Sequence, residues 1–180
     1  TLFPYTTLFR SDSSLEGEMT SADISGLIGQ YAHGNEPSHH IIHMYNYVDQ
    51  PYKTQELVDS VLHTLYFNDP NGLSGNEDCG QMSAWYILNA MGFYQVCPGN
   101  PVYSIGRPLF NKATVNLKDG KKFTVIAKNN SRENKYIQSM VLNGKALDKP
   151  FFTHQDIVNG GTDRKSTRLN SSHHSISYAV

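Results

Sequence analysis

The sequence lacks the features that mark nucleic-acid-binding, membrane-spanning or disulfide-rich proteins. Its 180 residues carry a formal net charge of −1 and no basic run, so nucleic acid is not an expected partner. No stretch approaches the ~20 apolar residues that a membrane span needs. Two cysteines, Cys79 and Cys97, are too few for a disulfide framework, and the sequence leaves their pairing open. What is present is an ordinary globular balance, with 38% hydrophobic and 17% charged residues.

The two ends of the chain differ from its middle. Residues 1–11 (TLFPYTTLFRS) and residues 163–180 (DRKSTRLNSS, then ISYAV) resemble translated sequencing adapters. We therefore expect both ends to be non-native and to carry no function. They hold four of the 15 basic residues and one of the 16 acidic ones, which leaves the middle with a net charge of −4. A mildly acidic middle suits a site that holds a cation or a sugar.

Residues 12–97 carry mainly helical patterns. Apolar residues recur at helical spacing in residues 22–32, and Pro37 suits the first turn of a second helix. Pro51 opens a third helix with one apolar stripe. A loop rich in Gly, Asn and Asp then leads to a fourth helix over residues 81–91, which a glycine stops.

Residues 98–162 change to a strand pattern. The runs Thr114–Leu117 and Phe123–Ala127 flank an Asp-Gly pair, which is a strong hairpin signal. A further strand is expected at Tyr136–Leu142, where an Asn-Gly pair turns the chain back. Helices followed by antiparallel strands predict an α+β fold, in which helical hairpins of an incomplete domain precede a small antiparallel sheet.

The first polar cluster is GNEPSHH, residues 34–40, at the mouth of the second expected helix. Helix capping just before Pro37 would explain one or two of its polar residues but not the paired histidines. His39 and His43 are four residues apart, a spacing that could bind zinc, although no third ligand accompanies them. Alternatively, His40 is a hydrogen-bonded core histidine.

The second polar cluster is GLSGNEDCGQ, residues 72–81, before the fourth expected helix. Asp78 and Gln81 fit a capping box, and a carboxylate at a helix N-terminus stays ionised. The same property suits a general base, and both roles are compatible. Trp85 and Tyr86 follow one turn later, and we interpret them as core residues rather than as a ligand platform.

Together these blocks resemble glycoside hydrolase family 92. The similarity runs in order through DISG, GNEPSHH, YNYVDQPYKTQ, GNEDCGQMSAWYILNAMGFYQVCPG and PVYSIGRPLF, and covers nearly all of the middle. Family members are calcium-dependent, exo-acting α-mannosidases that invert configuration. They have an N-terminal β-sandwich and a C-terminal (α/α)6 barrel, with the site between the two. The resemblance implies that this chain holds the last barrel helices and the strands that follow.

The resemblance also implies roles in catalysis. It makes Asp78 the base, with Asn76 at a position where many relatives carry a second aspartate. The general-acid glutamate of the family lies upstream of the matching stretch and cannot be assigned to Glu16 or Glu18. We therefore expect the chain alone to be inactive, because inversion needs both an acid and a base.

Calcium and sugar ligands follow from the same resemblance. Calcium prefers oxygen ligands, which points to Glu36 and Asn76, with Asn35 as a further substrate-binding or metal-binding residue. His39 and His40 are expected to hydrogen-bond sugar hydroxyls. The implied partners are mannose-containing glycans and the β-sandwich of the parent chain, and the parent is expected to be secreted, periplasmic or on the cell surface.

Two other functions are compatible with the sequence. One is a non-catalytic carbohydrate-binding or calcium-binding module that works through exposed sheet aromatics such as Phe151 or Phe152. The other is a glycosidase or phosphorylase of another (α/α)6 family, which would share the fold but not the GNEDCGQ block.

Overall fold

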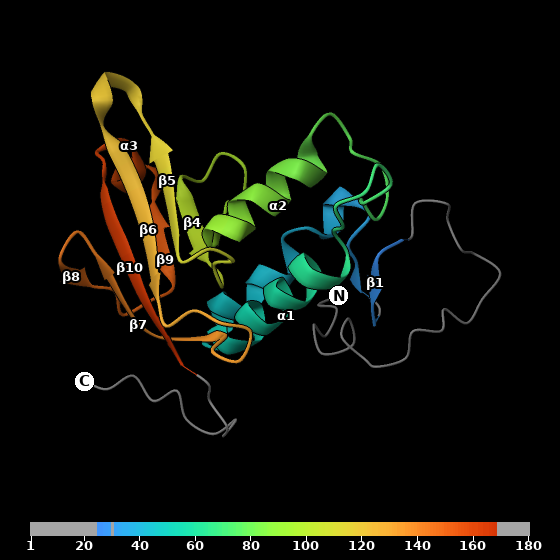
Figure 1. Ribbon diagram of the computed structural model, residues 1–180, viewed down its shortest axis with the longest axis horizontal. Coiled ribbons are helices and arrows are strands. Elements are labelled where there is room, and N and C mark those ends of the chain that lie inside the picture. The colour runs from blue at the N-terminus through green and yellow to red at the C-terminus, as the bar shows by residue number, and fades with distance from the viewer. Residues whose placement is uncertain (1–24, 30, 169–180) are drawn as a thin grey trace.

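The computed structural model describes residues 25–29 and 31–168, so both outermost stretches, 1–11 and 169–180, lie outside it. A helical part and a sheet part pack side by side (Figure 1). The elements in chain order are β1 (Leu27–Ile28), β2 (Tyr31–Ala32), the 3-10 helices η1 (Glu36–Ser38) and η2 (Ile41–Val48), α1 (Pro51–Thr64), α2 (Gln81–Met91), β3 (Phe93–Tyr94), β4 (Val102–Ile105), β5 (Lys112–Asn116), the 3-10 turn η3 (Lys118–Gly120), β6 (Lys122–Lys128), β7 (Tyr136–Leu142), β8 (Lys145–Ala146), β9 (Phe151–Thr153), α3 (His154–Val158) and β10 (Gly161–Arg168).

The helical part is built by α1 and α2, which confirm the third and fourth predicted helices. Pro51 occupies the first turn of α1, and α2 ends at Gly92, whose φ is +94°. Directly after the first polar cluster, where the second helix was predicted, the chain forms the 3-10 helix η2, and Thr54 of α1 donates to the Ile42 carbonyl of η2 at 2.8 Å. A buried cluster joins these elements; its members are Tyr31, Ile42, Val58, Val61, Leu62, Trp85 and Tyr94. The complete (α/α)6 barrel stays a prediction.

The helix predicted over residues 22–32 is wrong in its described part. β1 and β2 form a short antiparallel hairpin there, with Ile28 paired to Tyr31. Gly26 and Gly29 both have positive φ, +61° and +60°. Glycine adopts that conformation at little cost and is a poor helix former, so the apolar spacing in this segment reflects burial of a hairpin and not of a helix.

The larger sheet has five strands in the order β5-β6-β10-β7-β8. The predicted hairpin of β5 and β6 and the predicted strand β7 are confirmed. The sheet is mixed, not purely antiparallel as expected, because β10 runs parallel to β6 and antiparallel to β7. β10 also continues past the expected boundary at residue 162 to Arg168, and Asp163 and Lys165 on it form a buried ion pair.

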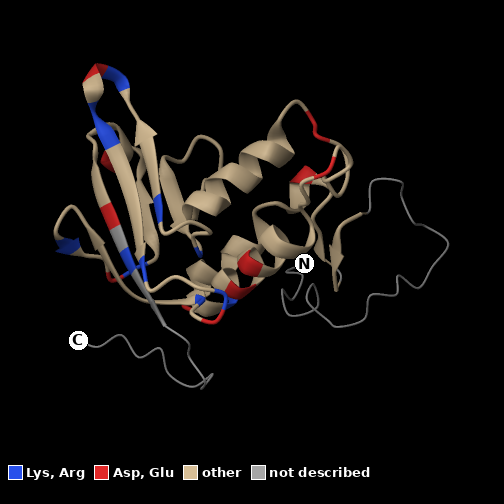
Figure 2. Ribbon diagram, in the orientation of Figure 1, with Lys and Arg blue, Asp and Glu red and all other residues tan. Residues whose placement is uncertain are grey.

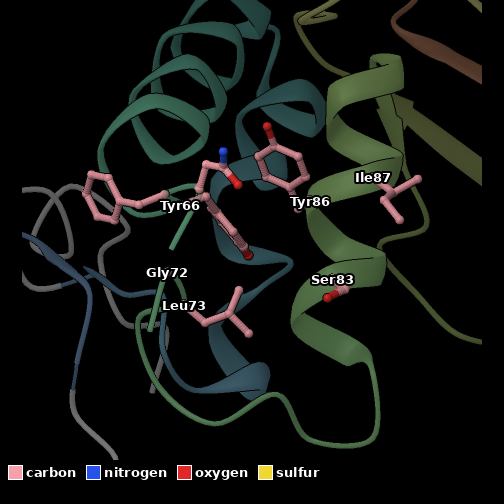
Figure 3. A pocket seen from close by; sticks show the side chains of 8 residues that line it. Tyr66, Gly72, Leu73, Ser83, Tyr86 and Ile87 are labelled. Carbon is pink, nitrogen blue, oxygen red and sulfur yellow. The ribbon is translucent and has the colours of Figure 1, made fainter. Parts of the chain in front are cut away.

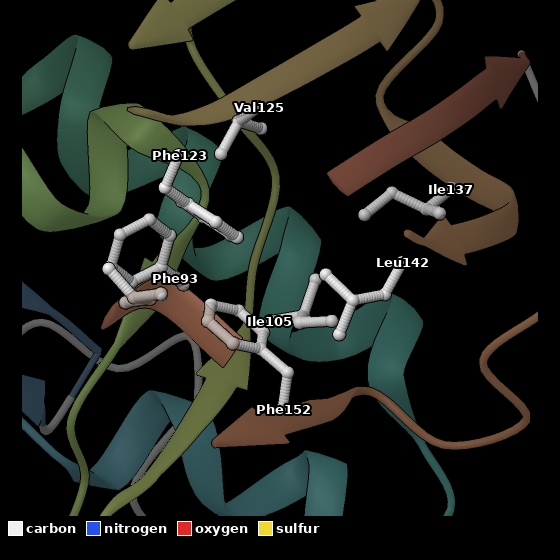
Figure 4. Packing of buried hydrophobic residues seen from close by; sticks show 8 residues of the cluster. Phe93, Ile105, Phe123, Val125, Ile137, Leu142 and Phe152 are labelled. Atoms are coloured by element: carbon white, nitrogen blue, oxygen red, sulfur yellow. The ribbon is translucent and has the colours of Figure 1, made fainter. Parts of the chain in front are cut away.

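A second buried cluster lies within the sheet part (Figure 4). Its members are Phe93, Ile105, Phe123, Val125, Ile137, Leu142, Phe152 and Ile157. Phe93 of β3 meets the rings of Phe123 and Phe152 edge-on, at centroid distances of 6.3 and 5.3 Å. Phe152 is only 3% exposed, so it is a core residue and not the exposed sheet aromatic that a carbohydrate-binding module would use.

Hydrogen bonds join the helical and sheet parts. Asn46 of η2 donates to the Ser104 hydroxyl at 2.7 Å and to the Ile105 carbonyl at 2.8 Å. The backbone amide of Ile137 in β7 donates to the Gln55 side chain of α1 at 2.9 Å. All five groups are buried, so the two parts are held in one orientation.

One open question of the sequence, the pairing of its two cysteines, is settled. Cys79 and Cys97 are both exposed and free, so they do not pair in this structure. Among the described residues, no helix is long and apolar enough to cross a membrane.

Candidate functional site

The two polar clusters of the sequence meet in space. We name residues 34–40 the histidine loop and residues 74–80 the acidic loop. A Cβ on Gly75 would lie 2.6 Å from the Gly34 carbonyl oxygen, and one on Gly34 would lie 2.2 Å from that of Ser74. The backbones touch because neither glycine carries a side chain. Acidic residues lie on both sides of this contact, in η1 and in the loop before α2 (Figure 2).

A buried histidine, His33, lies beneath the contact and was not foreseen. Its Nδ1 lies 2.9 Å from the Tyr31 hydroxyl and its Nε2 2.7 Å from the Tyr66 hydroxyl. Tyr66 donates its own proton to the Met82 carbonyl, so His33 Nε2 donates and His33 Nδ1 accepts. Burial, with a contribution from nearby His39, lowers the pKa of His33 to about 3. The ring is therefore neutral.

His39 and His43 are also buried and neutral. His39 donates from Nε2 to the His33 carbonyl at 3.0 Å, and burial lowers its pKa. His43 lies between the Ser104 hydroxyl and the Asn89 side-chain oxygen, at 3.2 and 2.9 Å, and burial lowers its pKa to about 4.

The zinc interpretation of the His39–His43 pair is not supported. His39 Nδ1 lies 3.3 Å from the Gln81 amide nitrogen, so every ring nitrogen of both histidines already has a partner. Within residues 25–29 and 31–168, no three His, Cys, Asp or Glu side chains gather as a metal site would require.

α2 ties the histidine loop to the acidic loop. Trp85 is fully buried, as predicted, and its indole donates to the His39 carbonyl at 3.1 Å. Gln81, in the first turn of α2, reaches both the His39 ring and the Tyr94 hydroxyl at 3.3 Å. The same helix thus begins at the acidic loop and fixes the histidines below it.

The acidic loop has an uncommon backbone. Asp78, Cys79 and Gly80 are consecutive residues with φ of +46°, +56° and +95°. A left-handed conformation costs roughly 1–2 kcal/mol for a residue with a side chain, and such conformations often occur at functional sites. Asp78 is exposed, and its carboxylate makes no hydrogen bond or ion pair with any residue that the structure describes.

The predicted capping box at Asp78 is wrong. The N-cap of α2 is Gly80, and no side chain at that position can cap. The side chain of the neighbouring Glu77 caps the first turn of α2 instead. Its two carboxylate oxygens accept from the Ser83 backbone amide at 3.1 Å and the Ser83 hydroxyl at 3.0 Å.

The other predicted site residues lie on or beside the two loops. Asn76 and His40 are exposed, and Asn35 and Glu36 are half-buried. His39 differs, because it is 1% exposed and both of its ring nitrogens have partners. The structure therefore favours a positioning role for His39 over the predicted direct contact with a sugar.

A groove of about 390 Å³ lies between α2 and the segment of residues 66–73 (Figure 3). Its lining residues are Tyr66, Phe67, Asn68, Gly72, Leu73, Ser83, Tyr86 and Ile87. None of the predicted site residues lines it. It adjoins the acidic loop through Ser83, whose hydroxyl binds Glu77.

Three important residues were missed by sequence reasoning. His33 directly follows the segment predicted as a helix, residues 22–32, and nothing in the sequence pairs its ring with Tyr31 and Tyr66. Glu77 and Ser83 are six residues apart, a spacing that no helical or capping pattern signals. The only available hint was that Glu77 directly precedes Asp78.

Comparisons with known proteins show which family the chain belongs to. The model of the glycosyl hydrolase family 92 catalytic domain matches residues 6–164. The structure resembles the family GH92 α-mannosidase BT3965 from Bacteroides thetaiotaomicron in complex with mannoimidazole, with 40% identity over 92% of this chain and a TM-score of 0.85. It also resembles the inverting family GH92 mannosidase BT2199 from the same organism, with 46% identity over 79% of this chain and a TM-score of 0.74.

A curated relative of the chain is also described as a glycosidase. An uncharacterized secreted glycosidase from Arthroderma benhamiae is 32% identical over 132 residues, 72% of this chain. The chain spans only about a fifth of these relatives: 22% and 19% of the two solved structures and 17% of the fungal protein. By its sequence match and by its fold, the chain belongs to glycosyl hydrolase family 92 and corresponds to part of the catalytic domain of that family.

Proposed function

We propose that this chain forms the base side of the active site in an exo-acting α-mannosidase that inverts configuration, and that Asp78 is the general base. The observation that carries the proposal is the exposed carboxylate of Asp78 in the acidic loop. Its carboxylate is exposed and makes no bond to the described residues, while the backbone around it is held in a left-handed conformation. A general base must be free to accept a proton from water.

The neighbours of Asp78 are consistent with this assignment. Both oxygens of Glu77 are engaged by Ser83, so Glu77 is the poorer candidate for a base. Asn76 is exposed on the same loop. An amide there can orient a water molecule or a sugar hydroxyl, although it cannot take up a proton as an aspartate would.

Inverting hydrolysis needs a second carboxyl group on the other side of the sugar. The two groups stand about 6.5–9.5 Å apart, which leaves room for the attacking water. Asp78 would remove a proton from that water while an acid protonates the leaving oxygen. We place this acid in the remainder of the longer protein, together with the β-sandwich that closes the site. Substrates of the whole protein would be terminal α-mannosides of glycans.

A hybrid enzyme tests the proposal. In it, residues 25–168 of this chain replace the matching stretch of the BT3965 α-mannosidase, to which the chain is 40% identical. The hybrid is expected to hydrolyse an aryl α-mannoside and to release β-mannose first, as monitored by proton NMR. Initial release of α-mannose would contradict the inverting mechanism.

Calcium is the cofactor we propose for the longer protein. The contact of Gly34 with Gly75 places Glu36 and Asn76 within two residues of the junction, and both offer the oxygen donors that calcium prefers. They fit calcium in kind but supply only part of the six to eight ligands it takes. Bound calcium would polarise sugar hydroxyls; Glu36 and Asn76 would help to hold it.

Calorimetry of the hybrid after removal of calcium tests this assignment. Glu36→Gln is expected to weaken calcium binding by at least about tenfold, which corresponds to about 1.4 kcal/mol. Glu56→Gln, at an exposed position of α1, is the matched control and should bind as the unaltered hybrid does. Equal affinity in both variants would remove Glu36 from the calcium site.

The remaining proposal concerns location. The fungal relative is described as secreted, and we propose that the longer protein is likewise secreted, periplasmic or attached to the cell surface, where glycan substrates are accessible.

A further inference from the structure

The side chain of Glu77 fastens the C-terminal half of the acidic loop to α2 through Ser83. Ser83 is the third residue of α2, and its amide is one of the helix-end donors that no helical carbonyl can satisfy. Glu77 Oε1 accepts from this amide at 3.1 Å while Oε2 accepts from the Ser83 hydroxyl at 3.0 Å. The negative charge also lies at the positive end of the helix, where it is stabilised.

The main chain strengthens the same fastening. The Glu77 carbonyl accepts from the Met82 amide at 3.3 Å, and the Asp78 carbonyl accepts from the Gln81 amide at 3.2 Å. The segment between Glu77 and the helix is therefore a closed turn. Within it lie Asp78 and Cys79, two of the six described non-glycine residues with positive φ. Both conformations are strained for residues that carry a side chain, and the bonds of Glu77 help to offset that strain.

An ordinary helix cap would not need this arrangement. A side chain at the N-cap position could satisfy the first turn without strain, yet that position is Gly80. Because Glu77 caps the helix, the adjacent Asp78 carboxylate is exposed to solvent and makes no hydrogen bond or ion pair with the described residues.

From this geometry we propose that Glu77 is a positioning residue, which clamps the acidic loop to Ser83 and thereby fixes the direction of the Asp78 carboxylate. The inference rests on the proposed function of Asp78 as base. Glu77 does not touch the reacting atoms. Its effect is on where Asp78 stands, and a displacement of about 1 Å at a reacting group can cost up to about 100-fold in rate.

The clamp predicts a specific pattern of rates in the hybrid enzyme. Glu77→Ala and Ser83→Ala should each lower kcat, by about 10-fold to 100-fold, with little change in KM. The double variant should be no slower than Glu77→Ala alone, because both substitutions break one interaction. Ser83→Thr, which keeps the hydroxyl and the amide, should retain nearly full kcat.

Three outcomes would overturn the clamp. If Glu77→Gln is as inactive as Asp78→Asn while Ser83→Ala is normal, Glu77 acts in the chemistry itself. If the clamp variants lose thermal stability but keep kcat, the bond is only structural. If the effects of Glu77→Ala and Ser83→Ala add fully, the two residues do not act together. A normal rate for Asp78→Asn would instead refute the proposed base and leave the clamp geometry standing.

Hydrogen exchange on this chain gives an independent check that needs no activity. The Ser83 amide should exchange slowly in the unaltered chain and at least about tenfold faster in Glu77→Ala, because its acceptor is removed. Gln138→Ala, at an exposed position of β7, is the control. Unchanged exchange at Ser83 in Glu77→Ala would refute the clamp.

Discussion

At the residue scale, three neutral histidines support the loops that carry the candidate site. Each ring of His33, His39 and His43 uses one nitrogen as donor and the other as acceptor, and all three are buried. A protonated ring would lose its acceptor and would place a charge in the core. The network therefore requires the neutral form.

This requirement predicts a loss of stability in acid. The pKa of His33 is lowered to about 3 and that of His43 to about 4, while an unfolded histidine titrates near 6.5. Between these values the unfolded chain binds more protons, so stability is full above about pH 6.5 and falls as the pH decreases. In that window each of these histidines lowers the free energy of unfolding by up to about 1.4 kcal/mol for each unit by which the pH decreases.

Urea unfolding of the chain at pH 7.5 and at pH 5 measures this effect. His154→Gln is the matched control, because His154 is exposed and belongs to α3, outside the histidine network, and it should show the same slope as the unaltered chain. A free energy of unfolding that is constant across this range would contradict the neutral network.

A second prediction at the residue scale concerns the loop contact. Gly75→Ala introduces a Cβ 2.6 Å from the Gly34 carbonyl oxygen, at a φ of +121°. Gly99 also has a positive φ, +86°, but open space around it. Gly99→Ala should cost only backbone strain, roughly 1–2 kcal/mol, and Gly75→Ala about 1–3 kcal/mol more. Equal urea midpoints for the two variants would show that the loops do not touch.

The sequence predicted where the polar clusters lie but not how their side chains are used. GNEPSHH and GNEDCGQ both lie at the candidate site, and the two glycines that permit their contact, Gly34 and Gly75, belong to these blocks. That Glu77, and not Asp78, caps the first turn of α2 could not be predicted. It depends on a left-handed backbone at Asp78 and Cys79, which are not glycines and give no local signal.

At the element scale, α2 carries the site on a rigid support. Trp85 belongs to the buried cluster of the helical part, and Leu88 and Met91 pack against that of the sheet part. A helix held by two cores is a firm base for the loop at its N-terminus.

The bond between α1 and β7 gives an element-scale prediction. Gln55→Ala removes the acceptor of the buried Ile137 amide, and an unsatisfied buried donor costs about 1–3 kcal/mol. Gln138→Ala, on the same strand but exposed, is expected to change the free energy of unfolding by less than about 0.5 kcal/mol. Urea unfolding of both variants checks the difference, and equal losses would mean that this bond does not link the two parts.

Local signals explain which elements were predictable. The ends of α2 were predicted to the residue, because Gly80 and Gly92 flank an apolar run. The β5–β6 hairpin follows from its Asp-Gly turn. β10 was not predicted because residues 163–168 fall in the adapter-like end of the sequence; its sequence is also polar, and it pairs in parallel with β6, about 40 residues away at Phe123–Gly161. Pairing over such distances depends on the assembled sheet and not on the strand itself.

At the scale of the whole molecule, we propose that the chain provides one side of an active site. It spans about a fifth of its family relatives, and the family resemblance implies that the general-acid glutamate lies upstream of the matching stretch. The chain alone is therefore expected to leave an aryl α-mannoside unhydrolysed in the presence of calcium, whereas the hybrid hydrolyses it. Turnover by the isolated chain would show that its own residues supply the acid.

The most direct test of the central claim is kcat of the hybrid with Asp78→Asn, beside Asp148→Asn at another exposed aspartate. Asparagine keeps the shape of the side chain but cannot accept a proton from water. We predict a fall in kcat of about 10²-fold to 10⁴-fold for Asp78→Asn and an unchanged kcat for Asp148→Asn. An Asp78→Asn hybrid as active as the unaltered one would contradict the assignment of Asp78 as the base.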